Sequence, residues 1–158
     1  MTTAETCITA CDYTRKTHRQ ALAEIINAYI EDEMGGGETL SEDGQLRLSE
    51  GLQACPGAIV LLAGQAGVYC GLLTAFEHFS TFTAQPMINI HDLIVLKAYR
   101  GQGIGRQLMN ALIAEAENRH CSRVTLEVRQ DNLAAQRLYR KLGFGDTDPP
   151  MFYWRKYL

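Results

Sequence analysis

The sequence predicts one α/β domain with a mixed, mostly antiparallel sheet. Strand-like apolar segments are interspersed with amphipathic helical segments along the chain. Three of the strand-like segments, 58–63, 68–76 and 88–96, follow one another without an intervening helix, which is typical of neighbouring antiparallel strands. The length of 158 residues and the hydrophobic fraction of 46% fit a single globular domain, taken as residues 1–158, and exclude a disordered or fibrous chain.

The N-terminal part is expected to hold one short strand and two helices. Residues 7–10 form the strand. A helix follows, with Thr17 and Gln20 in capping-box spacing and an apolar face made by Leu22, Ile25, Ile26 and Tyr29. The acidic, glycine-rich stretch 31–38 is predicted to be a loop, because consecutive glycines destabilise a helix. Residues 42–53 form the second short helix.

The remaining elements complete the sheet. Gly64 to Gly67 are predicted to be a four-residue hairpin loop between strands 58–63 and 68–76, and a Phe- and Thr-rich loop containing Pro86 leads to strand 88–96. An amphipathic helix over 103–119, a strand over 123–128 and a helix over 132–142 follow, the last ended by Gly143 in the C′ position. Residues 151–158 have strand propensity.

Composition limits the classes of function. The net charge of −3 argues against general nucleic-acid binding, and no apolar run approaches the length of a membrane span. The N-terminus lacks the pattern of a signal peptide, so a cytoplasmic protein is expected. Five cysteines without a CxxC pair, and histidines without partners at ligand spacing, indicate neither a disulfide framework nor a metal site.

The charges are distributed unevenly. Residues 1–80 carry eleven acidic and four basic side chains, whereas residues 81–158 carry seven acidic and eleven basic ones. Because a basic region can hold a polyanion and an acidic region can attract a cation, this polarity indicates two unlike ligands.

The glycine-rich turn before helix 103–119 has the chemistry of a phosphate site. Its glycines, at 101, 103 and 105, allow the backbone to approach a ligand closely, and the free N–H groups of the helix start point into the turn. Arg100 and Arg106 add positive charge. The spacing GxGxG differs from the dinucleotide fingerprint GxGxxG, and the GK[ST] ending of a Walker loop is absent.

Two motifs in this region resemble those of the GNAT superfamily of acyl-CoA-dependent N-acyltransferases. The first is Arg100-x-x-Gly103-x-Gly105 after an apolar strand and Tyr99. The second is Asn132-x-x-Ala135-x-x-x-Tyr139-x-x-x-Gly143-Phe144. Phe79-Ser-Thr-Phe82 and Ile90-His91-Asp92-Leu93 look most like the diamine and polyamine acetyltransferase branch.

The resemblance implies a GNAT-like fold whose central strands splay apart to hold acetyl-CoA as the acetyl donor, with no metal. Tyr139 would protonate the departing thiolate, a role that suits a phenol with a pKa near 10. A backbone N–H on strand 88–96 would polarise the thioester carbonyl. A homodimer is expected from the resemblance. The implied cofactor-binding residues are Leu93, Ile94, Val95, Arg100, Gly101, Gln102, Gly103, Ile104, Gly105, Arg106, Asn132, Ala135 and Tyr139.

A primary amine must lose a proton before or during its attack on the thioester, because a free alkylammonium has a pKa near 10.4. His91, directly or through water, is the candidate base. Asp92 would instead hold the substrate cation or orient groups around His91, and Glu127 is a rival base. Strict strand alternation would put His91, Leu93 and Val95 on one face and Ile90, Asp92 and Ile94 on the other.

The acceptor is expected to be a small amine, a polyamine or an amino-acid-like molecule. Glu31, Asp32 and Glu33 lie where the family builds its acceptor-binding loop, and their field would favour a cation; the alternative is a solvated loop. Two other functions stay open: a CoA-binding sensor that acetylates nothing, and an interaction protein with a vestigial site.

Overall fold

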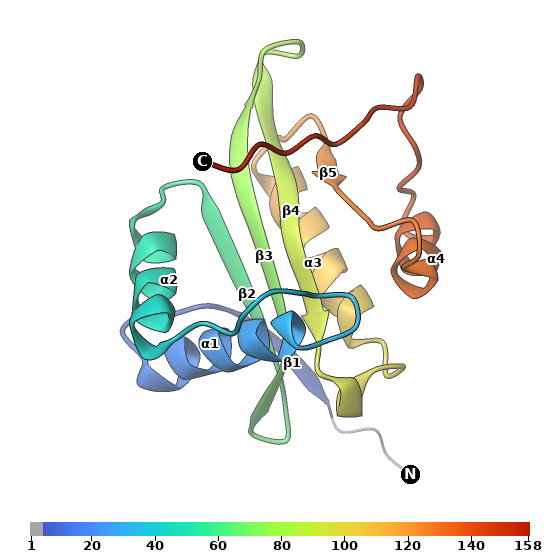
Figure 1. Ribbon diagram of the computed structural model, residues 1–158. Coiled ribbons are helices and arrows are strands. Elements are labelled where there is room, and N and C mark those ends of the chain that lie inside the picture. Colours follow the sequence, from blue (N-terminus) through green and yellow to red (C-terminus); the bar gives the residue numbers. More distant parts are fainter. Residues whose placement is uncertain (1–4) are drawn as a thin grey trace. The chain divides into compact units, whose positions relative to one another are not determined.

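The computed structural model describes residues 5–158. They divide into two compact units, one ending at Glu127 and one from Val128 to Leu158. The first unit contains a five-stranded sheet in the order β1-β2-β3-β4-β5, antiparallel from β1 to β4 and parallel between β4 and β5 (Figure 1). The predicted α/β class with a mixed, mostly antiparallel sheet is confirmed. The strands are β1 (Thr6–Ala10), β2 (Ala58–Gln65), β3 (Val68–Ser80), β4 (Gln85–Val95) and β5 (Val124–Leu126).

Helices lie between β1 and β2, between β4 and β5, and after β5. The first unit has α1 (Lys16–Ile30), α2 (Glu42–Ala54), the short 3₁₀ helix η1 (Lys97–Tyr99) and α3 (Ile104–Asn118), and the second unit has α4 (Leu133–Lys141). Ser41 caps α2 by accepting a hydrogen bond from the Gly44 N–H at 3.2 Å. Within residues 5–158, no helix is long and apolar enough to span a bilayer.

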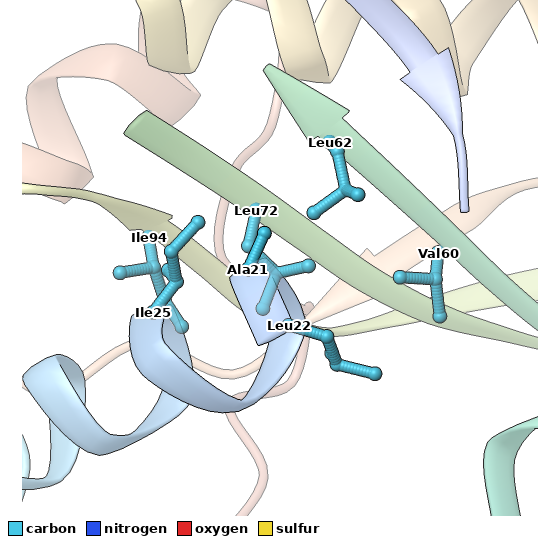
Figure 2. Packing of buried hydrophobic residues seen from close by; sticks show 7 residues of the cluster. All are labelled: Ala21, Leu22, Ile25, Val60, Leu62, Leu72 and Ile94. Atoms are coloured by element: carbon cyan, nitrogen blue, oxygen red, sulfur yellow. The ribbon is translucent and has the colours of Figure 1, made fainter. Parts of the chain in front are cut away.

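The sheet is covered on both faces. On one face, here the α1 face, Leu22 and Ile25 of α1 pack against side chains from β2, β3 and β4, as Figure 2 shows. Their strand partners are Val60, Leu62, Leu72 and Ile94. On the opposite face, a Cβ added to Gly71 would lie 3.1 Å from side-chain atoms of Ile104 and Leu108 of α3. The bare Gly71 backbone therefore lets α3 approach the sheet closely, and this face is here called the α3 face.

Two loops are shorter than predicted. The prediction of a four-residue loop at Gly64–Gly67 is wrong, because Gln65 pairs with Val68. Only Ala66 and Gly67 form the turn, both with positive φ (50° and 82°). Two left-handed residues match the twist of a hairpin, so the strands continue to the turn. The prediction that Pro86 lies in a loop is also wrong. Pro86 lies within β4 opposite Phe79, and Ser80 pairs with Gln85.

Two other local predictions are wrong, each for its own physical reason. The capping box at Thr17 and Gln20 does not form: α1 begins two residues earlier than that box requires, at Lys16, with Arg15 at the N-cap position. The buried His18 ring accepts a hydrogen bond from the Asp12 N–H at 2.9 Å, which fixes the entry of the chain into this helix. Residues 151–158 form no strand. Strand propensity reflects the fit of a side chain to a half-buried sheet, whereas Phe152 and Trp154 are exposed.

Candidate functional site

The parallel strands β4 and β5 separate shortly after they meet. They pair only from Ile88↔Val124 to Ile90↔Leu126, so β5 ends earlier than the predicted strand 123–128. β4 continues to Val95, and residues 92–95 pair within the sheet with β3 alone. The second edge of β4 is therefore a row of backbone groups to which no strand of the sheet is paired.

The backbone directions along this edge follow from one hydrogen bond. The Leu96 N–H donates to the Cys70 carbonyl of β3 at 2.9 Å. Because successive residues of a strand point their backbone groups to opposite edges, Val95 and Leu93 direct theirs away from β3. The Val95 carbonyl accepts a hydrogen bond from Arg100 Nε at 2.9 Å. The N–H groups of Leu93 and Val95 face the edge where a thioester arm is expected.

A β-bulge at His91 changes which side chains share a face. Thr74 pairs with Asp92 and Ala75 pairs with Ile90, so His91 is the extra residue on β4. Such a bulge breaks strict alternation. The prediction that Ile90 and Asp92 share a face and that His91 lies opposite Asp92 is therefore wrong. His91 Nδ1 lies 3.4 Å from Asp92 Oδ2, and the His91 ring meets the Phe76 ring edge-on at 5.8 Å.

The α1 face carries a polar cluster beside the point where β4 and β5 separate. The Thr74 hydroxyl donates to Asp92 Oδ2, the oxygen that His91 approaches. Further along, Asn89 Nδ2 donates to Thr125 Oγ1 at 3.0 Å and to Glu127 Oε1 at 3.3 Å. Both candidate bases, His91 and Glu127, thus lie in a hydrogen-bonded polar region. The sequence did not point to Thr74 or Asn89, because their roles depend on partners on other strands.

The glycine turn leads directly into the start of α3. Gly101 and Gly103 have φ values of 79° and 80°, a left-handed conformation that disfavours other residues. Gly103 is the N-cap of α3, so the first N–H groups of this helix lack intrahelical acceptors and carry the positive end of the helix dipole. Arg106 lies exposed in the first turn.

The acidic segment 31–33 lies beside the end of β4. Together with Ala28, Tyr29, residues 94–97 and Arg100, it lines a pocket of about 530 Å³. Asp32 accepts a hydrogen bond from the Met34 N–H at 3.1 Å and pairs with Arg100 at 2.6 Å. The Met34 N–H and then the Arg100 guanidinium lower the pKa of Asp32 from its ordinary value of 3.8. Arg100 therefore links the acidic segment to β4, and part of its charge is balanced by Asp32.

Removing this link should loosen the acidic segment. We expect Asp32→Asn to lower the free energy of unfolding by about 0.5–1 kcal/mol, the range of a partly exposed ion pair, and 1 M salt to reduce the difference. Folding lowers the pKa of Asp32, so the pair stabilises the protein above about pH 4 and less as pH falls through the lowered value. Urea unfolding at low and high salt measures both effects.

The matched control is Glu38→Gln, which removes one negative charge from an exposed residue of the same loop. Equal losses for Asp32→Asn and Glu38→Gln would show that net charge, rather than the Asp32–Arg100 pair, determines the effect.

The second unit contains the second motif. Asn132 caps α4, its Oδ1 accepting a hydrogen bond from the Ala135 N–H at 3.1 Å. At the other end, the Gly143 N–H donates to the Arg140 carbonyl and the Phe144 N–H to the Tyr139 carbonyl. With Gly143 at φ 88°, this is a Schellman cap and confirms the predicted C′ glycine. The Phe144 and Tyr139 rings lie 6.1 Å apart, so the cap helps to position Tyr139.

Across residues 5–158, no three His, Cys, Asp or Glu side chains group together so as to hold a metal ion.

Comparison with known proteins identifies the class. The profile of the Acetyltransferase (GNAT) family matches residues 21–144, and the chain belongs to this family. A 58-residue segment is 48% identical to the [ribosomal protein bS18]-alanine N-acetyltransferase of Escherichia coli, covering 37% of this chain and 39% of that protein. A 73-residue segment is 25% identical to the aminoglycoside N(6')-acetyltransferase type 1 of Salmonella typhimurium, covering 46% of this chain and 50% of that protein. The matches span half or less of these two relatives.

Solved structures share the fold. An integron cassette protein from the mobile metagenome of V. cholerae superposes with a TM-score of 0.80 at 24% identity, over 96% of this chain and 93% of that one. The aminoglycoside N-acetyltransferase AAC(6')-Iy, in a complex with the bisubstrate analogue CoA-S-monomethyl-acetylneamine, gives a TM-score of 0.78 at 19% identity, over 98% and 100%. Identities this low establish the fold alone.

Proposed function

We propose that the protein transfers the acetyl group of acetyl-CoA to a primary amine by direct attack in a ternary complex, with residues 1–158 acting as one catalytic domain. The observation that carries the proposal is the free β4 edge at residues 92–95, which leads through η1 into the glycine-capped start of α3. In a member of the GNAT family, this arrangement suits a ligand with an extended amide-rich arm and a pyrophosphate.

The chain's own groups suit such a donor, which supplies an activated thioester. The backbone N–H groups of Leu93 and Val95 would bind the arm, and one of them would polarise the thioester carbonyl as the carbonyl oxygen gains charge. Gln102 to Arg106 would hold the pyrophosphate with helix N–H groups and the Arg106 charge. The family resemblance implies that Asn132 and Ala135 also bind the donor.

The reaction needs a base for the amine and an acid for the departing thiolate. The alkylammonium loses one proton to His91, directly or through a water, and the neutral nitrogen then forms a bond to the carbonyl carbon. The nitrogen releases its second proton to solvent as the amide forms. The carbon–sulfur bond breaks, and Tyr139 gives a proton to the sulfur. Asp92 accepts from His91 and orients the ring. The carboxylates of Glu31 and Glu33, with Asp32 partly neutralised by Arg100, would draw a cationic acceptor to the pocket at the end of β4.

The acceptor should be a cationic amine of a small molecule or an amino-acid-like group, with polyamines as the specific expectation. The test is release of free thiol from acetyl-CoA with a polyamine, an aminoglycoside, an alanine-initiated peptide or no acceptor. We expect amine-dependent release, fastest with the polyamine. Acetyl-CoA binding without amine-dependent release would favour a CoA sensor, and absence of acetyl-CoA binding would favour an interaction protein with a vestigial site.

A further inference from the structure

The bulge in β4 depends on a residue of the neighbouring strand. Thr74 of β3 lies directly opposite Asp92, on one side of the bulge. The next residue, Ala75, pairs with Ile90 on the other side of the bulge. Thr74 as a whole residue is 3% exposed. A hydroxyl buried to this degree requires a hydrogen-bond partner, and Thr74 finds it in Asp92 Oδ2.

The same carboxylate oxygen lies beside His91. Asp92 Oδ2 accepts from Thr74 and is 3.4 Å from His91 Nδ1. A carboxylate oxygen can only accept hydrogen bonds, so this contact favours a proton on Nδ1, and in the neutral ring the lone pair is then on Nε2. The Phe76 ring of β3 contacts the imidazole edge-on. The charged group next to His91 is thus Asp92 on β4. β3 contributes the uncharged Thr74 and Phe76, and Glu127 after β5 is bound to Asn89.

We infer that Thr74 is a positioning residue for the acetyl-transfer reaction: its hydroxyl fixes the Asp92 carboxylate, which in turn holds His91 as the Nδ1–H tautomer with Nε2 available as the base. This inference rests on the proposed function, because it assigns the geometry of the base in that reaction. Thr74 itself touches neither substrate. It acts through Asp92 and His91, and its hydroxyl rather than its methyl group is the active part.

Two substitutions separate these parts of the side chain. Thr74→Val keeps the branched shape and removes the hydroxyl, whereas Thr74→Ser keeps the hydroxyl and removes the methyl group. We expect Thr74→Val to lower kcat about tenfold, comparable to the loss of one hydrogen bond, with an unchanged KM for acetyl-CoA. Thr74→Ser should stay within about twofold of the wild type. An equal loss in both variants would overturn the inference, because packing would then explain it.

A double-mutant cycle tests whether the effect passes through His91. In a His91→Gln background, Thr74→Val should change kcat by less than about twofold, because the group that it positions is gone. The same tenfold loss in both backgrounds would overturn the inference. Full activity of His91→Gln alone would overturn both the base assignment and the inference, while continued amine-dependent thiol release would leave the acetyltransferase function standing.

A spectroscopic readout does not depend on turnover. The chain has four histidines, so long-range ¹H–¹⁵N correlation spectra of the imidazoles are simple, and comparison with His91→Gln assigns His91. We expect the Nδ1–H tautomer of His91 to dominate in the wild type and in Thr74→Ser, and the Nε2–H form to increase in Thr74→Val. The same tautomer populations in all three proteins would overturn the inference even if the protein acetylates no amine.

Discussion

Replacing Tyr139 with phenylalanine is expected to lower kcat by about 10²- to 10⁴-fold, the range for loss of a general acid. The substitution removes only the phenolic hydroxyl, so the departing thiolate would leave without a proton from the enzyme. The Schellman cap that follows α4 uses the Tyr139 backbone carbonyl, and the ring contact with Phe144 needs no hydroxyl. Steady-state kinetics at saturating acetyl-CoA measure the change, and KM for acetyl-CoA should change little.

The control for this prediction is Tyr157→Phe, which removes a hydroxyl from an exposed tyrosine of the same unit. We expect this variant to keep its turnover. Unchanged kcat in Tyr139→Phe would remove Tyr139 from the reaction and leave protonation of the thiolate to solvent or to another group.

Replacing His91 with glutamine should also lower kcat by about 10²- to 10⁴-fold near neutral pH. An alkylammonium acceptor with a pKa near 10.4 is almost fully protonated there, so the reaction needs a base. As pH rises toward that value, an increasing fraction of the acceptor is already neutral. The deficit of His91→Gln relative to the wild type should therefore shrink as pH rises, and a pH–rate profile of both enzymes measures this.

His78→Gln is the matched control, because His78 is an exposed histidine on β3 outside the polar cluster. Glu127→Gln tests the rival base. A large, pH-dependent loss in Glu127→Gln together with a small loss in His91→Gln would transfer the role of base to Glu127. Asn89, which donates to Glu127, would then be the residue that orients it.

The parts of this structure that the sequence predicts are those set by local chemistry. Gly103 and Gly143 occupy positions that need a positive φ at a helix start and at a helix end, and spacing alone identifies both. The apolar stretch at 93–96 identifies the end of the strand that leads into the glycine turn. The family motifs overlap these positions, because the turn before α3 and the C-terminal cap of α4 both depend on glycine.

The parts that the sequence misses depend on partners far along the chain. Asp32 and Arg100 are 68 residues apart, and nothing near either one indicates the ion pair. The bulge at His91 exists because β3 pairs on either side of it, and one extra residue reverses the faces that alternation assigns. The contact of Thr74 with Asp92, 18 residues away, could not be predicted for the same reason. Such contacts can be read only once the register of the strands is known.

The separation of β4 from β5 has a consequence for the stability of the whole fold. Residues 92–95 pair with one strand only, which creates a strand edge inside a sheet, and unpaired edges are templates for association with other chains. A ligand that hydrogen-bonds along this edge completes the sheet much as an added strand would. Acetyl-CoA bound there at 100 times its Kd would contribute about 2.7 kcal/mol to folding. The supply of acetyl donor would then govern how much of the protein stays folded as well as how fast it works.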